Sequence, residues 1–170
     1  MTPPGTIIEY LDSGRFICGL VLQNNNNRLR LLNQNGREMN LPASRVVTAS
    51  KTKHQLASRE DRIALLKEMA AIRAALTDAI PLEEIWELAS EEEEEAFPAD
   101  FLAELSFGEN LTDDQSAAFL RAVFTDRFFF KYKNEMVNVH TPEQVEQLRH
   151  QRQKEKEKEA VLKDGAAFLQ

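Results

Sequence analysis

Short apolar runs separated by turn-forming residues fill residues 5 to 47, which is the pattern of closely spaced β-strands. Strands are predicted over residues 6 to 10, 16 to 22, 29 to 32 and 38 to 41. Asn35-Gly36 is typical of a hairpin turn, and Pro42 ends the pairing because proline has no N–H to donate. Strands this short, joined by tight turns, indicate a small SH3-like or cold-shock-like β-barrel rather than a parallel sheet.

A helical spacing of apolar residues begins at Ser58, where Ser58-Arg59-Glu60-Asp61 has the form of a helix start. The apolar stripe that follows is made of Ile63, Leu66, Met69 or Ala70, Ile72, Leu76 and Ile80. About 20 residues of α-helix span roughly 30 Å. We therefore expect one long helix that acts as a spacer between the barrel and the segment after it.

Three short helices and a β-hairpin are predicted after this helix. Pro81 and Pro98 suit the first turn of a helix, and Gly108 suits a C-terminal cap. Thr112 then opens a capping box for the third helix. Two strand-like runs follow at residues 128 to 132 and 136 to 139. Three helices followed by a hairpin is the element order of a winged helix.

The last segment begins with a capping box at Thr141 and runs into the alternating charges of residues 154 to 159. It has few apolar residues, so we expect an exposed charged helix, and the end at residues 168 to 170 suggests that more protein follows. The predicted fold class is α+β. Its parts are a small β-barrel (1 to 52), a connecting helix (53 to 80), a winged-helix-like domain (81 to 141) and a charged C-terminal helix (142 to 170).

The 170 residues have the composition of a soluble globular protein, with 42% hydrophobic and 29% charged residues and a net charge of -7. No apolar run approaches the roughly 20 residues that cross a bilayer, and the first four residues lack the features of a signal peptide. We expect a cytoplasmic protein with no membrane contact. Its single cysteine, Cys18, lies in an apolar run and is expected to be a buried thiol.

Charge is distributed unevenly along the chain. The first 57 residues contain seven basic side chains against three acidic ones, whereas residues 81 to 126 contain Arg121 alone against fourteen acidic residues. A basic end suits a polyanionic partner. Duplex binding relies on Lys and Arg at the phosphates, so the acidic winged helix is expected to be a scaffold and DNA is not expected as a partner.

Two surfaces are candidates for binding single-stranded RNA, which is read by stacking on aromatic side chains and by basic groups at the phosphates. The barrel offers Arg15, Arg28, Arg30, Arg37 and Arg45, with Tyr10 or Phe16 as the stacking aromatic. The hairpin offers Lys131 and Lys133, with Arg127, beside Phe128, Phe129, Phe130 and Tyr132. The alternative for the barrel is a protein-interaction module whose arginines only keep it soluble.

No pattern predicts catalysis, a metal site or a cofactor. His54, His140 and His150 lie far apart, and there is no Gly-rich phosphate loop or nucleophile motif. The consecutive carboxylates of residues 91 to 95 point in several directions, so they are expected to be solvated surface. Trp86 shares its segment with leucine and isoleucine and is expected in the core.

Several short motifs and the order of the predicted parts resemble the N-terminal region of bacterial ribonuclease II-type exoribonucleases. The motifs are Gly5-Thr6-Ile7-Ile8-Glu9-Tyr10, Leu31-Leu32-Asn33, Gly36-Arg37-Glu38, Leu41-Pro42 with Arg45-Val46-Val47, Leu105-Ser106-Phe107-Gly108 and Asp126-Arg127-Phe128-Phe129-Phe130-Lys131. In that family, a small barrel and a winged-helix-type segment precede a catalytic domain that holds magnesium on clustered aspartates and hydrolyses RNA from its 3′ end.

The catalytic domain of that family is missing from this chain, so no catalytic residue is carried over and magnesium is implied only for the missing part. Asp113-Asp114 at a helix start is better explained by capping and the helix dipole. We therefore predict a non-catalytic module that binds single-stranded RNA and guides it to the parent's catalytic domain. The alternatives are a protein-interaction module, which docks a partner or that catalytic domain, and a DNA-binding regulator.

Overall fold

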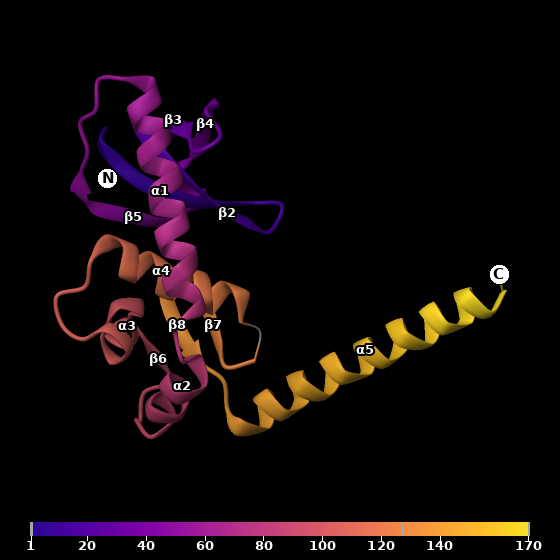
Figure 1. Ribbon diagram of the computed structural model, residues 1–170. Coiled ribbons are helices and arrows are strands. Elements are labelled where there is room, and N and C mark those ends of the chain that lie inside the picture. The colour runs from indigo at the N-terminus through magenta and orange to yellow at the C-terminus, as the bar shows by residue number, and fades with distance from the viewer. Residues whose placement is uncertain (1, 127, 170) are drawn as a thin grey trace. The chain divides into compact units, whose positions relative to one another are not determined.

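The computed structural model describes residues 2–126 and 128–169, with side chains described as far as residue 160 (Figure 1). The fold is α+β, and the described residues form a five-stranded antiparallel sheet, a three-stranded sheet and five α-helices. Two compact units make up the chain. The first unit joins Met1–Pro81 to Ala99–Ala122, and the second joins Leu82–Pro98 to Val123–Gln170.

The larger sheet belongs to the first unit and has the strand order β4-β3-β2-β1-β5. Its strands are β1 (Thr6–Asp12), β2 (Arg15–Asn25), β3 (Arg28–Asn33), β4 (Glu38–Pro42) and β5 (Val46–Lys53). The four strands predicted from the sequence are confirmed. The fifth is not predicted, because β5 has few apolar residues; it follows a short 3-10 helix at Ala43–Arg45 and returns to pair with β1.

The side chains of β1 alternate between the two faces of the sheet, as the pleat requires, and this divides the core in two. One cluster consists of Ile8, Tyr10, Val21, Leu29, Leu31 and Leu41. The other consists of Ile7, Cys18, Leu20, Leu66 and Met69. The second cluster therefore unites the sheet with the helix that follows it.

Helix α1 (Arg59–Asp78) begins as predicted, with the Ser58 hydroxyl accepting a hydrogen bond from the Asp61 backbone N–H. The sequence predicts a spacer helix between the barrel and the next segment, but α1 packs against the sheet instead. Leu66 and Met69 are buried against the sheet, and α1 lies along the sheet in Figure 1. The first compact unit consequently extends past the predicted boundary at residue 52, because α1 supplies one side of its core.

The remaining helices lie close to their predicted positions. They are α2 (Leu82–Ser90), α3 (Ala99–Phe107), α4 (Asp113–Thr125) and α5 (Pro142–Leu169). Both predicted capping boxes form, since Thr112 and Thr141 each accept a hydrogen bond from the backbone N–H of the glutamine three residues later. None of the described helices has the length and apolar character needed to cross a membrane.

The smaller sheet belongs to the second unit and has the order β6-β8-β7. The predicted hairpin is formed by β7 (Phe130–Lys133) and β8 (Met136–Val139), and the short β6 (Ala96–Phe97), which the sequence does not predict, pairs with β8. Trp86 is half-buried against Phe129, with ring centroids 5.3 Å apart, and its indole N–H donates to the backbone carbonyl of His140 over 2.8 Å.

Candidate nucleic-acid interface

All five barrel arginines predicted to contact RNA are exposed on the larger sheet or its turns; they are Arg15, Arg28, Arg30, Arg37 and Arg45. Arg28 and Arg30 are two residues apart on β3, so their side chains leave the same face of the sheet. Arg30 pairs with Glu38 over 2.9 Å, and both side chains are well exposed. Such a surface pair contributes at most about 1 kcal/mol, so RNA phosphate can compete for Arg30.

The two aromatic residues predicted to stack on bases are placed differently. Tyr10 is only 2% exposed, and its hydroxyl lies 3.1 Å from the sulfur of Met39 inside the core. Tyr10 cannot stack on a base while the sheet is intact, so the prediction that it contacts RNA is wrong. Phe16 is half-buried, and its ring faces the guanidinium of Arg121, whose carbon lies 5.5 Å from the ring centroid.

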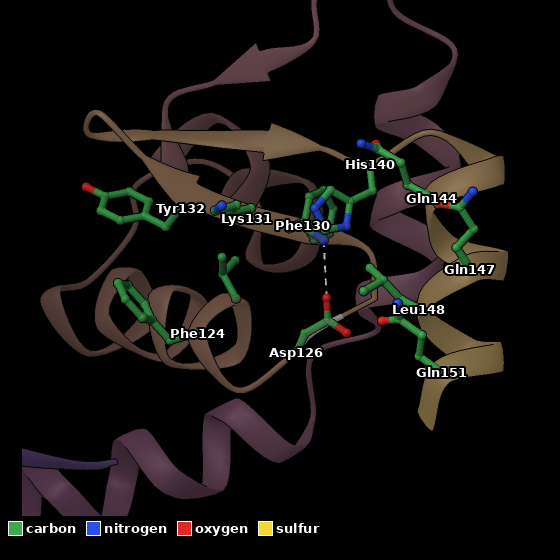
Figure 2. Close-up of a pocket in the computed structure, with 11 residues that line it drawn as sticks. Phe124, Asp126, Phe130, Lys131, Tyr132, His140, Gln144, Gln147, Leu148 and Gln151 are labelled. Carbon is green, nitrogen blue, oxygen red and sulfur yellow. Dashed lines mark hydrogen bonds between the residues drawn. The ribbon is translucent and has the colours of Figure 1, made fainter. Parts of the chain in front are cut away.

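The hairpin of the second unit presents the other predicted surface. Lys131 and Lys133 are exposed, whereas Arg127 lies outside the described residues. Among the aromatics, Phe129 and Phe130 are buried at 8% and 2% exposure, while Tyr132 is half-buried and packs on Phe124 (Figure 2). Burial, and then the charge of Glu135, raise the pKa of Tyr132. Phe128 is half-buried as well, so this segment keeps two partly exposed aromatics and two exposed lysines.

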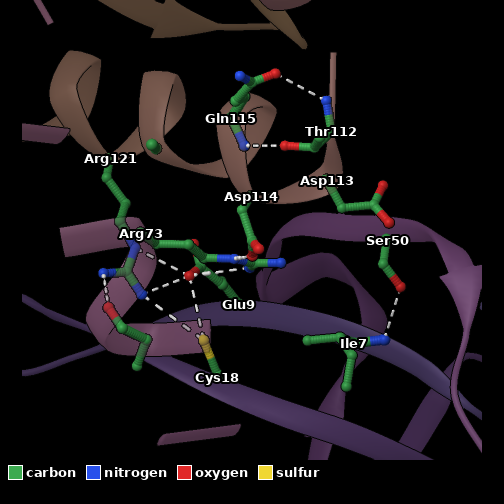
Figure 3. Close-up of polar contacts among 12 residues, drawn as sticks. Ile7, Glu9, Cys18, Ser50, Arg73, Thr112, Asp113, Asp114, Gln115 and Arg121 are labelled. Carbon is green, nitrogen blue, oxygen red and sulfur yellow. Dashed lines mark hydrogen bonds and ion pairs between the residues drawn. The ribbon is translucent and has the colours of Figure 1, made fainter. Parts of the chain in front are cut away.

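A buried charge network lies inside the first unit (Figure 3). Glu9 is 0% exposed, and one of its carboxylate oxygens lies 3.1 Å from Nη1 of Arg73 and 2.5 Å from Nη2 of Arg121. Arg73 donates in turn from Nε to Asp114 over 2.7 Å. Burial disfavours the charged form of Arg73, but the attraction of Glu9 and the hydrogen bond to Asp114 outweigh the effect of burial, so the pKa of Arg73 is raised. Two carboxylates thus balance two guanidiniums inside the unit.

Cys18 belongs to this network, since its thiol donates to the Glu9 carboxylate over 3.3 Å. Burial, and then the negative charge of Glu9, raise the pKa of the Cys18 thiol to about 12. A thiol in this state is neutral at physiological pH and is a poor nucleophile. The prediction that Cys18 is buried is confirmed.

The first turn of α4 is also hydrogen-bonded to the larger sheet. The carboxylate of Asp113 accepts hydrogen bonds from the backbone N–H groups of Lys51 (2.9 Å) and Thr52 (3.2 Å), which lie on β5. Capping and the helix dipole therefore do not account for both aspartates. Asp113 binds the edge strand, and Asp114 pairs with Arg73.

This network is not predicted from the sequence, although a signal for it is present there. Glu9 interrupts the apolar strand β1, and Arg121 lies within the apolar face of α4. Isolated charges of opposite sign at core positions must be paired, because an unpaired buried charge is too costly.

Among the described residues, no group of three or more histidine, cysteine, aspartate or glutamate side chains is placed to hold a metal ion. The glutamates at residues 91 to 95 are all exposed. No protein-family model, curated protein or solved structure matches the chain.

Proposed function

We propose that the chain is a non-catalytic module that binds single-stranded RNA through the exposed arginines of the larger sheet and guides it to the catalytic domain of a ribonuclease II-type 3′-to-5′ exoribonuclease. The observation that carries this proposal is the burial of Glu9. Of the three acidic residues in the first 57, only Asp12 and Glu38 are exposed, against seven exposed basic side chains. The surface is therefore more basic than the sequence count implies, which favours a phosphate backbone as ligand.

The finer fold assignments belong to the same proposal. A meander of four strands, then a 3-10 turn and a last strand that returns to β1, supports an SH3-like barrel. The element order α2, β6, α3, α4, β7, β8 is that of a winged helix, although α3 and most of α4 belong to the first compact unit. Magnesium chemistry would belong to the catalytic domain. The proposal also places the protein in the cytoplasm, where an unpaired cysteine stays reduced.

A protein-interaction module is the second candidate, and one observation favours it. Phe101 and Leu105 are four residues apart on α3 and are 48% and 46% exposed. Two large apolar side chains on one face of an acidic helix suit a protein partner, whether separate or the parent's catalytic domain, better than they suit RNA.

Titration of a fluorescently labelled single-stranded RNA with the full chain tests the first proposal. The variant R28A/R30A should bind more weakly than the parent. A matched control is K154A/K156A, which removes the same charge from exposed positions on α5. The control should bind within about twofold of the parent, because it keeps every arginine of the larger sheet.

The same titration separates the candidate surfaces. If R28A/R30A binds as the parent does while K131A/K133A loses affinity, the hairpin is the RNA surface and the barrel proposal is wrong. If the parent itself shows no salt-sensitive binding to single-stranded RNA, the protein-interaction module takes its place. Equal weakening of binding in R28A/R30A and in the control would mean a nonspecific response to net charge.

A further inference from the structure

The second unit contains a hollow of about 500 Å³, bounded by the end of α4, by β7 and by the start of α5 (Figure 2). This volume lies within the usual range for small-ligand sites, about 300 to 1,000 Å³. The side chains that matter for its chemistry are Phe124, Phe130, Lys131, Tyr132, Gln147 and Gln151.

One end of the hollow is aromatic. Phe124 and Tyr132 have ring centroids 5.4 Å apart and are tilted by 49°, and Figure 2 shows them together, away from α5. Phe130, only 2% exposed, lies between this pair and α5. A half-buried ring at the mouth of a hollow with an apolar wall provides a platform on which a planar group can stack.

The other end is lined by amides from α5. Gln144 is engaged locally, because its side-chain oxygen accepts the Thr141 backbone N–H in the capping box. Gln147 and Gln151 are four residues apart, so they share a face of the helix, and both are exposed. Each amide offers two donor hydrogens and an acceptor oxygen, which suits a ligand that carries hydroxyl groups.

The hollow is lined by one basic and one acidic side chain, Lys131 and Asp126. Lys131 is exposed and lines the hollow. The carboxylate of Asp126 also lines it, but one of its oxygens already accepts the backbone N–H groups of Phe129 (2.8 Å) and Phe130 (3.2 Å). These two bonds occupy that oxygen, and Lys131 is the one positively charged side chain that lines the described hollow and could contact a phosphate.

From this arrangement we infer that the hollow binds one unpaired nucleotide of an RNA strand. The base stacks on Tyr132 beside Phe124, the ribose that joins base and phosphate turns its hydroxyls toward Gln147 and Gln151, and Lys131 contacts the phosphate. Contacts to the 2′-hydroxyl distinguish RNA from DNA. The inference rests on the proposed function only in taking RNA as the ligand, since the hollow belongs to the second unit and the barrel arginines to the first.

NMR titration of the isotope-labelled full chain tests this inference. The probes are the four ribonucleoside monophosphates, their 2′-deoxy counterparts and ribose 5-phosphate. We expect at least one ribonucleotide to shift the side-chain amide signals of Gln147 and Gln151 saturably, and to bind more tightly than its deoxy counterpart. Ribose 5-phosphate, which lacks a base, should bind much more weakly.

Variants assign the response to the hollow. Y132L should weaken ribonucleotide binding about tenfold, the typical effect of losing one base stack, whereas Y132F should bind as the parent does. Q147A/Q151A should reduce the preference for ribose over deoxyribose. Q153A is the matched control, because Gln153 is exposed on the same helix but does not line the hollow.

Three results would overturn the inference. The first is no saturable shift of the amide signals with any ribonucleotide. The second is that ribose 5-phosphate binds as tightly as the ribonucleotides do. The third is that ribonucleotide binding is unchanged both in Q147A/Q151A and in Y132L. The outcome is independent of the barrel. R28A/R30A should leave the mononucleotide response of Gln147 and Gln151 unchanged. The inference about the hollow can therefore be wrong while the barrel proposal is right, and the barrel proposal can be wrong while the inference about the hollow is right.

Discussion

Arg121 donates two hydrogen bonds to the carboxylate of Glu9, from Nε at 2.9 Å and from Nη2 at 2.5 Å, although 112 positions separate the two residues in the chain. Glu9 lies in β1 and Arg121 in α4. With Arg73 of α1 on the same oxygen, this acid joins three elements of the first unit at one point.

Replacement of Glu9 by glutamine should lower the free energy of unfolding by about 3 to 5 kcal/mol, because it leaves buried guanidiniums without their counter-charge. Urea unfolding followed by far-UV circular dichroism measures the change. Glu38→Gln is the matched control. It breaks an exposed pair with Arg30 and should cost about 1 kcal/mol or less. Equal effects of the two substitutions would show that the buried network does not stabilise the fold.

Replacement of Asp113 by alanine should cost about 1 to 2 kcal/mol, since two backbone N–H groups of β5 are left without a charged acceptor. Hydrogen exchange gives the local readout, because the amides of Lys51 and Thr52 should exchange faster while those of β3 keep their protection. Glu109→Ala, at an exposed loop position, should change neither property. Unaltered exchange at Lys51 and Thr52 in the Asp113 variant would contradict the hydrogen bonds to Asp113.

The Cys18 thiol should resist alkylation in the folded protein and react only as fast as the unit unfolds. Its neutral state and burial leave almost no accessible thiolate at pH 8. Labelling with iodoacetamide, with and without urea, and mass spectrometry of the product measure the difference. Rapid stoichiometric labelling without urea would rule out the buried thiol.

Cys18 should also make stability depend on alkaline pH. Its pKa is raised to about 12 in the folded state, whereas an unfolded thiol ionises near 8.5. The stabilising contribution of the neutral thiol is therefore complete below the unfolded pKa and is lost as the pH rises toward the folded pKa. Relative to C18A, the parent should lose up to about 1.4 kcal/mol per pH unit in that window. Parallel curves for the two proteins would contradict the shift.

RNA binding by the parent should weaken steeply with salt, and R28A/R30A should flatten that dependence. Removal of one basic side chain from a single-strand phosphate reduces the slope of log K against log salt by about 0.7, so removal of two reduces it by about 1.4. Titrations at four salt concentrations give the slope. A lower affinity with an unchanged slope would mean that the two arginines do not touch phosphates.

Local signals in the sequence predict much of the fold. The capping boxes at Thr112 and Thr141 connect residues only three apart, so the sequence alone specifies them, and both form. The strands of the first hairpins are predictable for the same reason. β5 escapes prediction because its identity depends on pairing with β1, more than 30 residues earlier, rather than on its own alternation.

The candidate site shows the same limit. The sequence locates the barrel arginines, but it does not show that Glu9 is buried. The burial of Glu9 depends on Arg73 in α1 and Arg121 in α4, which lie far away in the sequence. Tyr10 is expected at the surface because aromatic residues suit stacking. The alternation of β1 decides otherwise, since it places Tyr10 beside Ile8 in the core.

The discontinuity of the first unit has a consequence for biosynthesis. Its five strands and α1 are translated before α4, and residues 82–98 of the second unit lengthen the interval between them. About 40 residues separate the end of α1 from Arg121, which corresponds to a few seconds at typical translation rates of roughly 5 to 20 residues per second. During this interval Glu9 has Arg73 beside it but not Arg121. The first unit therefore cannot complete its buried charge network until α4 has been synthesised.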